Sequence, residues 1–321
     1  MNAFERYNIR FLSPTMIAQW NQAPATLVLR RIFGVKGKAN ANMWRGDAVE
    51  AGLQYYLGRR SADKEAEANA KTLAVETFWQ RADGEVTEET EAAVALVAPM
   101  VEQAILATAN CTATLMGSQF GIEHFLDGVS AAFTGRMDFL FDDKSIIELK
   151  ATTRCPPSLE TVSISHRWQA AFYAAARRQP VKLLYVTAKK HQAFDVMPDD
   201  ESLHTLTRSA ASLERALERA ADGVSLLKTL PMNVGSFYWD EENLDAYEKA
   251  IEGDLPALSG PGTESLAAQG IITFGKHAGK SIKEVPDSYL NWLLNPKLSD
   301  GGEFDVPEEL QDAIHKMREA A

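Results

Sequence analysis

The segment of residues 135–153, GRMDFLFDDKSIIELKATT, constrains the fold more than any other part of this 321-residue chain. Its first half is an apolar run around Asp138, and a turn sequence, Asp-Asp-Lys-Ser, follows it. In the second half, apolar residues alternate with Glu148 and Lys150, which is the period-2 pattern of a strand. The segment therefore predicts a β-hairpin that carries two acids and a lysine, with Glu148 and Lys150 on one face.

A charged cluster on a sheet face requires partners, because an unpaired buried charge is unfavourable. A bound cation would be one such partner. The carboxylates of Asp138 and Glu148 and the main-chain carbonyl of Leu149 are hard oxygen ligands that suit Mg²⁺ or Mn²⁺. Lys150 would then orient or help to deprotonate an attacking water, or stabilise charge on a phosphate. The alternative interpretation is a surface hairpin with a cross-strand salt bridge.

A helix is expected over residues 165–178, SHRWQAAFYAAARR. Gln169 and Tyr173 lie four residues apart and would share one helical face. The neighbouring face is apolar at helical spacing and would pack on the sheet; it consists of Trp168, Ala171, Phe172 and Ala175.

The order of these features resembles the RecB-like branch of the PD-(D/E)XK nuclease superfamily. In that branch a strand with Asp, a strand with Asp/Glu-x-Lys and a helix with Gln-x-x-x-Tyr follow one another. The resemblance implies that Asp138 and Glu148 are metal ligands and that Lys150 is the catalytic lysine. It also implies that Gln169 and Tyr173 form the helical motif that contacts the site and DNA.

The resemblance covers about residues 10–195 and is strongest over residues 135–173. It implies an α/β fold with a restriction-endonuclease-like core, in which helices flank a central mixed sheet. The cofactor that it implies is Mg²⁺ or Mn²⁺.

The same resemblance suggests two further acids. Relatives place a histidine that assists the metal on a helix ahead of the strands. The corresponding helix here, residues 44–57, contains Gly46 and offers Glu50 instead, whose carboxylate would add a hard oxygen ligand. Glu123, in the strand-like sequence FGIEHFLDG, resembles an additional acid that many relatives carry. Either acid could instead be an ordinary solvated side chain.

The net charge of −11 disfavours a nucleic-acid partner at first sight, because affinity for DNA depends on Lys and Arg meeting phosphates. The distribution of charge changes this conclusion. Residues 1–60 hold nine lysines and arginines against three acids, and residues 149–194 hold eight against Glu160 alone. The basic segments are those that carry the motifs, as expected of a DNA-binding face on an acidic protein.

Cys111 and Cys155 are the only cysteines, so the chain cannot build the four-cysteine iron–sulfur cluster found in some RecB-like nucleases. Two isolated thiols suit a reducing compartment. No apolar run approaches the roughly 20 residues that span a bilayer, and the N-terminal sequence lacks the pattern of a secretory signal. We therefore expect a protein without a membrane partner in the cytoplasm of a bacterial host cell.

The remaining patterns predict how the chain is organised. Residues 1–252 would form the nuclease domain, with a helical insertion at about 62–110 that lies beside the site. A long helix at about 200–229 has a narrow apolar stripe, which suits packing either on the core or on a second copy of the chain. The Pro-, Gly- and Ser-rich residues 253–270 read as a flexible linker, and residues 271–321 as a small module.

The module resembles a short domain appended to several bacterial and phage exonucleases, with a Phe-Gly-Lys…Gly-Lys hairpin and a Pro-x-x-Tyr-Leu-x-Trp helix. Its sequence GKHAGKS lacks the first glycine of a phosphate-binding loop, because Phe274 stands there, so ATP binding is not expected. Charge and stacking could hold a DNA strand, or the two aromatic residues could instead form the module's core. The residues concerned are Lys276, His277, Lys280, Lys283, Tyr289 and Trp292.

Together these features predict a metal-dependent DNA exonuclease of phage or prophage recombination type. Its expected partners are DNA and a single-strand annealing protein. One alternative is a sequence- or structure-specific endonuclease on the same fold, which would cut covalently closed circles. Another is a catalytically inactive DNA-binding scaffold, because a fold does not fix a function. The intact set of motif residues argues against that second alternative.

Overall fold

The computed structural model describes residues 2–60, 65–198, 201–260, 270–272, 277, 280–294 and 306–319. The chain forms two compact units. One unit consists of Met1–Ile9, Ala23–Val35 and Ala216–Ala321, and the other of Arg10–Gln22 and Lys36–Arg215. This division differs from the predicted boundary after residue 252, because segments from both ends of the chain pack together in the first unit.

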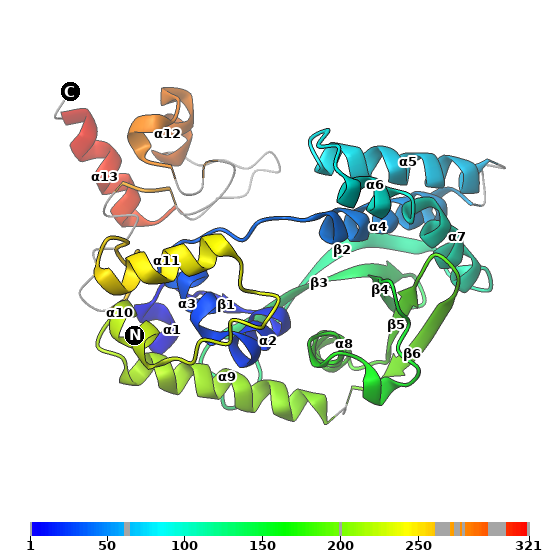
Figure 1. The fold of residues 1–321 in the computed structure, drawn as a ribbon, viewed down its shortest axis with the longest axis horizontal. Helices are drawn as coiled ribbons and strands as arrows, with labels where there is room; N and C mark the ends of the chain where they lie inside the picture. Colours follow the sequence, from blue (N-terminus) through cyan, green and yellow to red (C-terminus); the bar gives the residue numbers. More distant parts are fainter. Residues whose placement is uncertain are drawn as a thin grey trace. The chain divides into compact units, whose positions relative to one another are not determined.

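The second unit is built on a mixed sheet that has six strands in the described residues (Figure 1). They are β1 (Phe11–Leu12), β2 (Leu115–His124), β3 (Ala132–Phe141), β4 (Ile146–Ala151), β5 (Val181–Val186) and β6 (His191–Val196). The order is β1-β3-β4-β5-β6, with β2 also paired to β3. The β1–β3 and β4–β5 pairs are parallel and the others antiparallel. The predicted α/β class with a central mixed sheet flanked by helices is confirmed.

The predicted hairpin is formed by β3 and β4. Its turn is closed by the Phe141 amide, which donates to the Ser145 carbonyl at 3.1 Å. The two strands pair only next to this turn, through Phe139 with Ile147 and Leu140 with Ile146. Beyond these pairs β3 and β4 separate, while β4 continues beside β5. The hairpin is therefore forked, and the opening of the fork contains the charged residues.

One face of the sheet is covered by a layer of helices: α4 (Ala41–Arg59), α5 (Ala66–Arg81), α6 (Glu88–Val94) and α7 (Val97–Thr108). These helices share a core with apolar side chains of the sheet, namely Phe139, Phe141, Ile147, Leu149, Leu184 and Val186. The predicted insertion at 62–110 is helical as expected. However, it is part of the main core and is not a separate wall beside the site, because its apolar residues pack against both α4 and the sheet.

The segment Glu88–Thr108 is long and apolar enough to cross a membrane by length and composition alone. Such a segment was not expected from the sequence. In the structure it consists of α6 and α7, and the buried residues of α7 pack in the helical layer against α4 and α5. Its apolar character is thus used in core packing.

The opposite face of the sheet carries α8 (Ile164–Arg177), with α2 (Pro14–Gln22) and α9 (Ser202–Arg219) around it (Figure 1). Two buried tryptophans tie these helices together through their indole N–H groups. Trp168 of α8 donates to Thr205 Oγ1 of α9 at 2.8 Å, and Trp20 of α2 donates to Ser212 Oγ of α9 at 2.8 Å. These bonds fix α8 over the strands.

The predicted helix over residues 200–229 is divided in the structure. After α9 ends, α10 (Gly223–Thr229) starts anew with Asp222 as its N-cap, whose carboxylate accepts from the Ser225 amide at 2.6 Å. Gly223 also packs closely, since a β-carbon there would lie 2.7 Å from Ile32 Cγ2. The apolar stripe in the sequence continues through this break, so it did not indicate that α9 ends at Arg219. The N-cap Asp222 and the closely packed Gly223 mark the start of a new helix.

The first unit contains α1 (Ala3–Arg6), α3 (Pro24–Ile32), α10, α11 (Glu241–Glu252), α12 (Asp287–Leu294) and α13 (Glu308–Glu319). The C-terminal residues have an apolar core of their own, against which Tyr289 and Trp292 pack with their rings stacked 5.5 Å apart. The start of the predicted linker is anchored, because the Leu258 amide donates to the Ile32 carbonyl at 2.6 Å. Lys276 lies outside the described residues.

Helix α4 packs so closely on its neighbours that Gly52 has no room for a side chain. A β-carbon there would lie 2.9 Å from the Ala70 carbonyl oxygen and 2.9 Å from Val101 Cγ2. We expect Gly52→Ala to lower the free energy of unfolding by about 1–3 kcal/mol, as overpacked cores do. Gly46→Ala on the same helix is the control, because a β-carbon at residue 46 meets nothing within 4 Å.

The control substitution should raise the free energy of unfolding by about 0.5–1 kcal/mol, since alanine is the better helix former. Urea-induced unfolding measures both effects. Equal effects of the two substitutions would contradict the close packing of α4.

Candidate functional site

The candidate site lies where β3 and β4 separate. Continuing their register places Asp138 opposite Glu148, and Asp138 Oδ2 accepts a hydrogen bond of 2.8 Å from the Leu149 amide. Within a strand, the amide and carbonyl of one residue point to the same edge. The Leu149 carbonyl therefore also points into the fork, on the side where a metal-binding oxygen was expected from the sequence.

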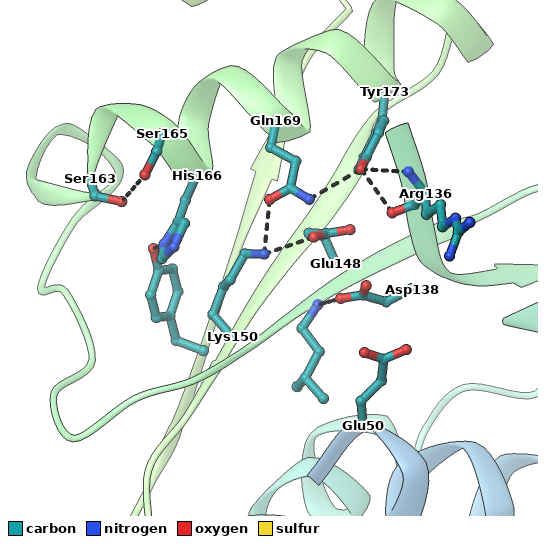
Figure 2. Close-up of polar contacts among 12 residues, drawn as sticks. Glu50, Arg136, Asp138, Glu148, Lys150, Ser163, Ser165, His166, Gln169 and Tyr173 are labelled. Carbon is teal, nitrogen blue, oxygen red and sulfur yellow. Dashed lines mark hydrogen bonds and ion pairs between the residues drawn. The ribbon is translucent and has the colours of Figure 1, made fainter. Parts of the chain in front are cut away.

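Lys150 is the central cation of the site (Figure 2). Its Nζ lies 2.7 Å from Glu148 Oε1 and donates to Gln169 Oε1 of α8 at 2.9 Å. Glu148 is fully buried, and its second oxygen, Oε2, has no hydrogen-bond partner in the described part of the chain. The prediction that Glu148 and Lys150 share a face is confirmed, and α8 covers that face.

Tyr173 anchors this network to the main chain of β3. Its hydroxyl donates to the Arg136 carbonyl at 2.8 Å and accepts from the Arg136 amide at 3.1 Å. It also accepts from Gln169 Nε2 at 3.1 Å. Because its proton and its lone pairs are engaged within the protein, Tyr173 positions Gln169, which in turn positions Lys150.

The Tyr173 hydroxyl binds a stretch of β3 whose backbone pairs with neither β1 nor β4. Strand β1 pairs only with Ala132 and Phe133, and β4 only with Phe139 and Leu140. Both lie on the edge opposite β2, so residues 134–138 have no strand partner there in the described structure. Gly135 makes room for the ring, since a β-carbon there would lie 2.5 Å from Tyr173 Cε1.

Glu50 reaches the fork from the other side of the sheet, on α4 (Figure 2). The link is Gln119 of β2, whose Nε2 donates both to Glu50 Oε1 and to Asp138 Oδ1, the latter at 3.3 Å. Gln119 has a left-handed backbone, with a φ of 52°. A non-glycine residue in this region is uncommon and often marks a functional position.

Burial dominates the electrostatics of the site. It raises the pKa of Glu148 to about 8, and burial together with the nearby Asp138 charge raises the pKa of Glu50 to about 7. Burial raises the pKa of Asp138 as well, although the charge of Lys150 opposes this. For Lys150, burial favours the neutral amine, but the charges of Glu148 and Asp138 outweigh it and raise the pKa. The ammonium form of Lys150 is therefore retained at neutral pH.

The donor set fits one divalent cation. Three carboxylates and one ammonium sum to a charge of −2 when all are ionised, and Glu148 Oε2 is an unpartnered buried oxygen. Among the described residues, no three His, Cys, Asp or Glu side chains are grouped so that they could hold a metal by themselves. Asp138 and Glu148 would therefore share the ion with the Leu149 carbonyl and water, a mixed shell of the kind that Mg²⁺ accepts.

The structure does not bring Glu123 to this cluster. Glu123 is exposed and lies opposite Thr134, four residues before Asp138 on β3. At about 3.3 Å per residue this separation is about 13 Å along the strand. In the described structure, Glu123 forms no hydrogen bond or ion pair with the other site residues.

Sequence reasoning missed Gln119 and the pair formed by His166 and Tyr185. Tyr185 lies beside Lys150 in the sheet, and its hydroxyl is 2.6 Å from His166 Nδ1. Burial and the charge of Lys150 lower the pKa of His166 to about 3, so its ring is neutral. The only available signal was the position of His166, three residues before Gln169 and thus near it on the helix.

No model of a known protein family matches the sequence, and no curated protein matches it. Among solved structures, a candidate exonuclease from Eubacterium rectale aligns with 73% of this chain and 89% of its own, at a TM-score of 0.44 and 11% identity. The solved structure of SSO0001 aligns with 55% of this chain and 75% of its own, at a TM-score of 0.27 and 16% identity. Both likenesses are distant.

Removing the Tyr173 hydroxyl should weaken both the fold and the site. Tyr173→Phe leaves the main chain of Arg136 and the Gln169 amide without their partner, which should lower the free energy of unfolding by about 1–3 kcal/mol. Tyr55→Phe on α4, a tyrosine outside the site, should change it by no more than about 0.5 kcal/mol. Chemical denaturation of both variants measures this, and a Tyr173→Phe variant as stable as the wild type would show that the hydroxyl does not support β3.

The raised pKa values of Glu50 and Glu148 predict how stability depends on pH. Acids whose pKa is higher in the folded than in the unfolded state favour folding below their unfolded pKa, and this contribution is lost as pH rises through the folded values, here about 7 and 8. Mg²⁺ should offset the repulsion between the ionised acids. We therefore expect the Mg²⁺-induced rise in Tm to be larger at pH 8.5 than at pH 6.

Thermal unfolding with Mg²⁺ and with chelator at both pH values measures this effect. The double variant Asp138→Asn, Glu148→Gln should lose the Mg²⁺ response, and Glu50→Gln should reduce it without abolishing it. A Mg²⁺ response of equal size at both pH values would contradict the assignment of these acids.

Proposed function

We propose that this chain is a divalent-metal-dependent deoxyribonuclease of the PD-(D/E)XK type that hydrolyses phosphodiester bonds as an exonuclease. The observation that carries the proposal is the meeting of Asp138, Glu148 and Lys150 in one fork, with Lys150 held 2.7 Å from Glu148 and 2.9 Å from Gln169. A salt bridge that served stability alone would not need a second buried acid opposite it, because buried charges are costly. The surface-hairpin interpretation is therefore disfavoured.

Asp138 and Glu148 would hold the cation together with the Leu149 carbonyl. The cation supplies Lewis acidity towards the phosphate when it is bound. Lys150 has three N–H donors, of which two are directed to Glu148 and Gln169. In the described part of the chain no acceptor takes the third, so it can donate to a phosphate oxygen. Since the ammonium is retained, Lys150 stabilises the charge that develops during hydrolysis rather than removing a proton.

The basic character of residues 149–194 supports a DNA substrate, since these residues include both Lys150 and the whole of α8. We base exonucleolytic action, a role in phage or prophage recombination and a single-strand annealing partner on the sequence resemblance. A second copy of the chain rests on the apolar stripe at about 200–229, and a cytoplasmic location on the two isolated thiols. A further DNA contact by the C-terminal module, through Lys280 and Lys283, rests on the sequence resemblance.

Digestion of linear and of covalently closed circular DNA, with Mg²⁺ and with chelator, tests this function. An exonuclease degrades only the linear form, and only with Mg²⁺. Cleavage of the closed circle would favour the endonuclease alternative. Absence of cleavage of either form with Mg²⁺ or Mn²⁺ would favour the inactive DNA-binding scaffold.

Substitutions in the fork should abolish cleavage while the protein stays folded. We expect Asp138→Asn, Glu148→Gln and Lys150→Met each to lower kcat on the order of a thousandfold or more, because residues that act together on a transition state are lost together. Glu123→Gln is the control and should retain activity within about twofold, since Glu123 lies outside the cluster. A variant of the fork with near-wild-type activity would contradict the site assignment.

A further inference from the structure

Helix α8 continues past the site as a stripe of residues four apart: Gln169, Tyr173 and Arg177. The first two belong to the network around Lys150. Arg177 extends the same stripe to β2, where its guanidinium carbon lies over the ring of Phe120, 5.9 Å from the ring centroid. Eight helical residues span about 12 Å at about 1.5 Å per residue. The stripe therefore connects the fork with a second contact point on β2.

Phe120 is a large aromatic residue that is 44% exposed, and a cation lies over its ring. It directly follows Gln119, the residue that links Glu50 to Asp138. An exposed Phe alone is not informative, because apolar atoms make up much of any protein surface. An exposed ring beside a site, paired with an arginine, has the two elements that bind single-stranded nucleic acid: a surface for base stacking and a charge for phosphate.

The glycines of β2 point to a ligand independently of Phe120. Gly117 and Gly121 lie two residues to either side of Gln119, and a β-carbon at either position would meet nothing within 4 Å. Neither glycine has a positive φ. Neither packing nor backbone conformation therefore requires glycine at these positions. Glycine weakens a strand, so its presence here has no structural reason within the described chain. A strand left bare in this way allows another molecule to approach its main chain closely.

Charge favours a phosphodiester backbone on this surface. Arg136 is exposed and lies opposite Gly121 in the β2–β3 register. Neighbouring strand residues point to opposite faces, so Gly121 and Arg136 lie on one face of β2, and Phe120 with Arg177 on the other. Cations therefore accompany both faces of this part of β2. Glu123, two residues past Gly121, is exposed and would repel phosphate, which limits the surface at that end.

We propose that an unpaired strand of nucleic acid runs along β2 beside the fork, with one base stacked on Phe120 and a phosphate bound by Arg177. This inference rests on the proposed function and defines its substrate as a single-stranded end. Stacking on an exposed ring requires an unpaired base, which a closed duplex does not offer.

Binding of a fluorescent single-stranded oligonucleotide in the Lys150→Met background tests the inference without cleavage. Phe120→Ala should weaken binding about tenfold, because it removes the ring on which one base stacks, and Phe120→Trp should retain binding. Gly121→Val should weaken binding to a similar extent by occupying the bare strand. Its Tm should be unchanged or higher, since valine favours strands and the space is open.

Two matched controls should bind as the background protein does. Phe125→Ala removes the ring of another exposed phenylalanine, a residue just after β2 that is 64% exposed. Arg59→Ala removes the arginine of a second cation–π pair, in which the guanidinium carbon lies 5.2 Å from the Tyr55 ring centroid.

Unchanged binding in both Phe120→Ala and Gly121→Val would overturn the inference. Equal weakening for blunt duplex and for single-stranded DNA would overturn the choice of an unpaired strand. If Gly121→Val fails to fold, the open space at residue 121 is contradicted and Phe120→Ala decides the binding surface. A wild type that cleaves no DNA would instead contradict the proposed function, and the binding measurements would still decide this inference.

Discussion

The hydrogen bond between the Asp138 carboxylate and the Leu149 amide determines the geometry of the site. It takes the place of the next backbone pair in the β3–β4 ladder, so the strands separate while the main chain of β4 keeps a partner. Without this substitution, the hairpin would remain closed and the Leu149 carbonyl would be used in the sheet. A side chain that takes the place of a backbone partner thus creates an opening in the middle of the sheet. The backbone amide at the opening still has a hydrogen-bond acceptor.

The opening is electrostatically unfavourable for the folded chain. Three acids with raised pKa values and one buried lysine are held together by elements from both faces of the sheet: α4 brings Glu50, and α8 brings Gln169. Their positions are fixed by apolar packing, through the shared core of α4–α7 on one face and the tryptophans of α8 and α2 on the other. The core therefore holds the acids closer together than they would lie if they were free to separate.

The hairpin and α8 could be predicted because their apolar residues recur with periods of 2 and 3.6. The grouping of Asp138, Glu148, Lys150, Gln169 and Tyr173 followed from motif order. Gln119 could not be found in this way, since its role depends on strand pairing between β2 and β3 and on a left-handed backbone. The break before α10 and the two-unit division depend on contacts such as that of Gly223 with Ile32, about 190 residues apart, which no local pattern contains.

Tyr173 also protects the chain from self-association. Between β1 and β4, the main chain of β3 is an internal sheet edge, and exposed edges recruit strands from other molecules. The phenol at Arg136 occupies this edge with a side chain, so the sheet tolerates a gap that a foreign strand could otherwise enter. Because α8 carries Tyr173, protection of this edge depends on the packing of that one helix on the sheet.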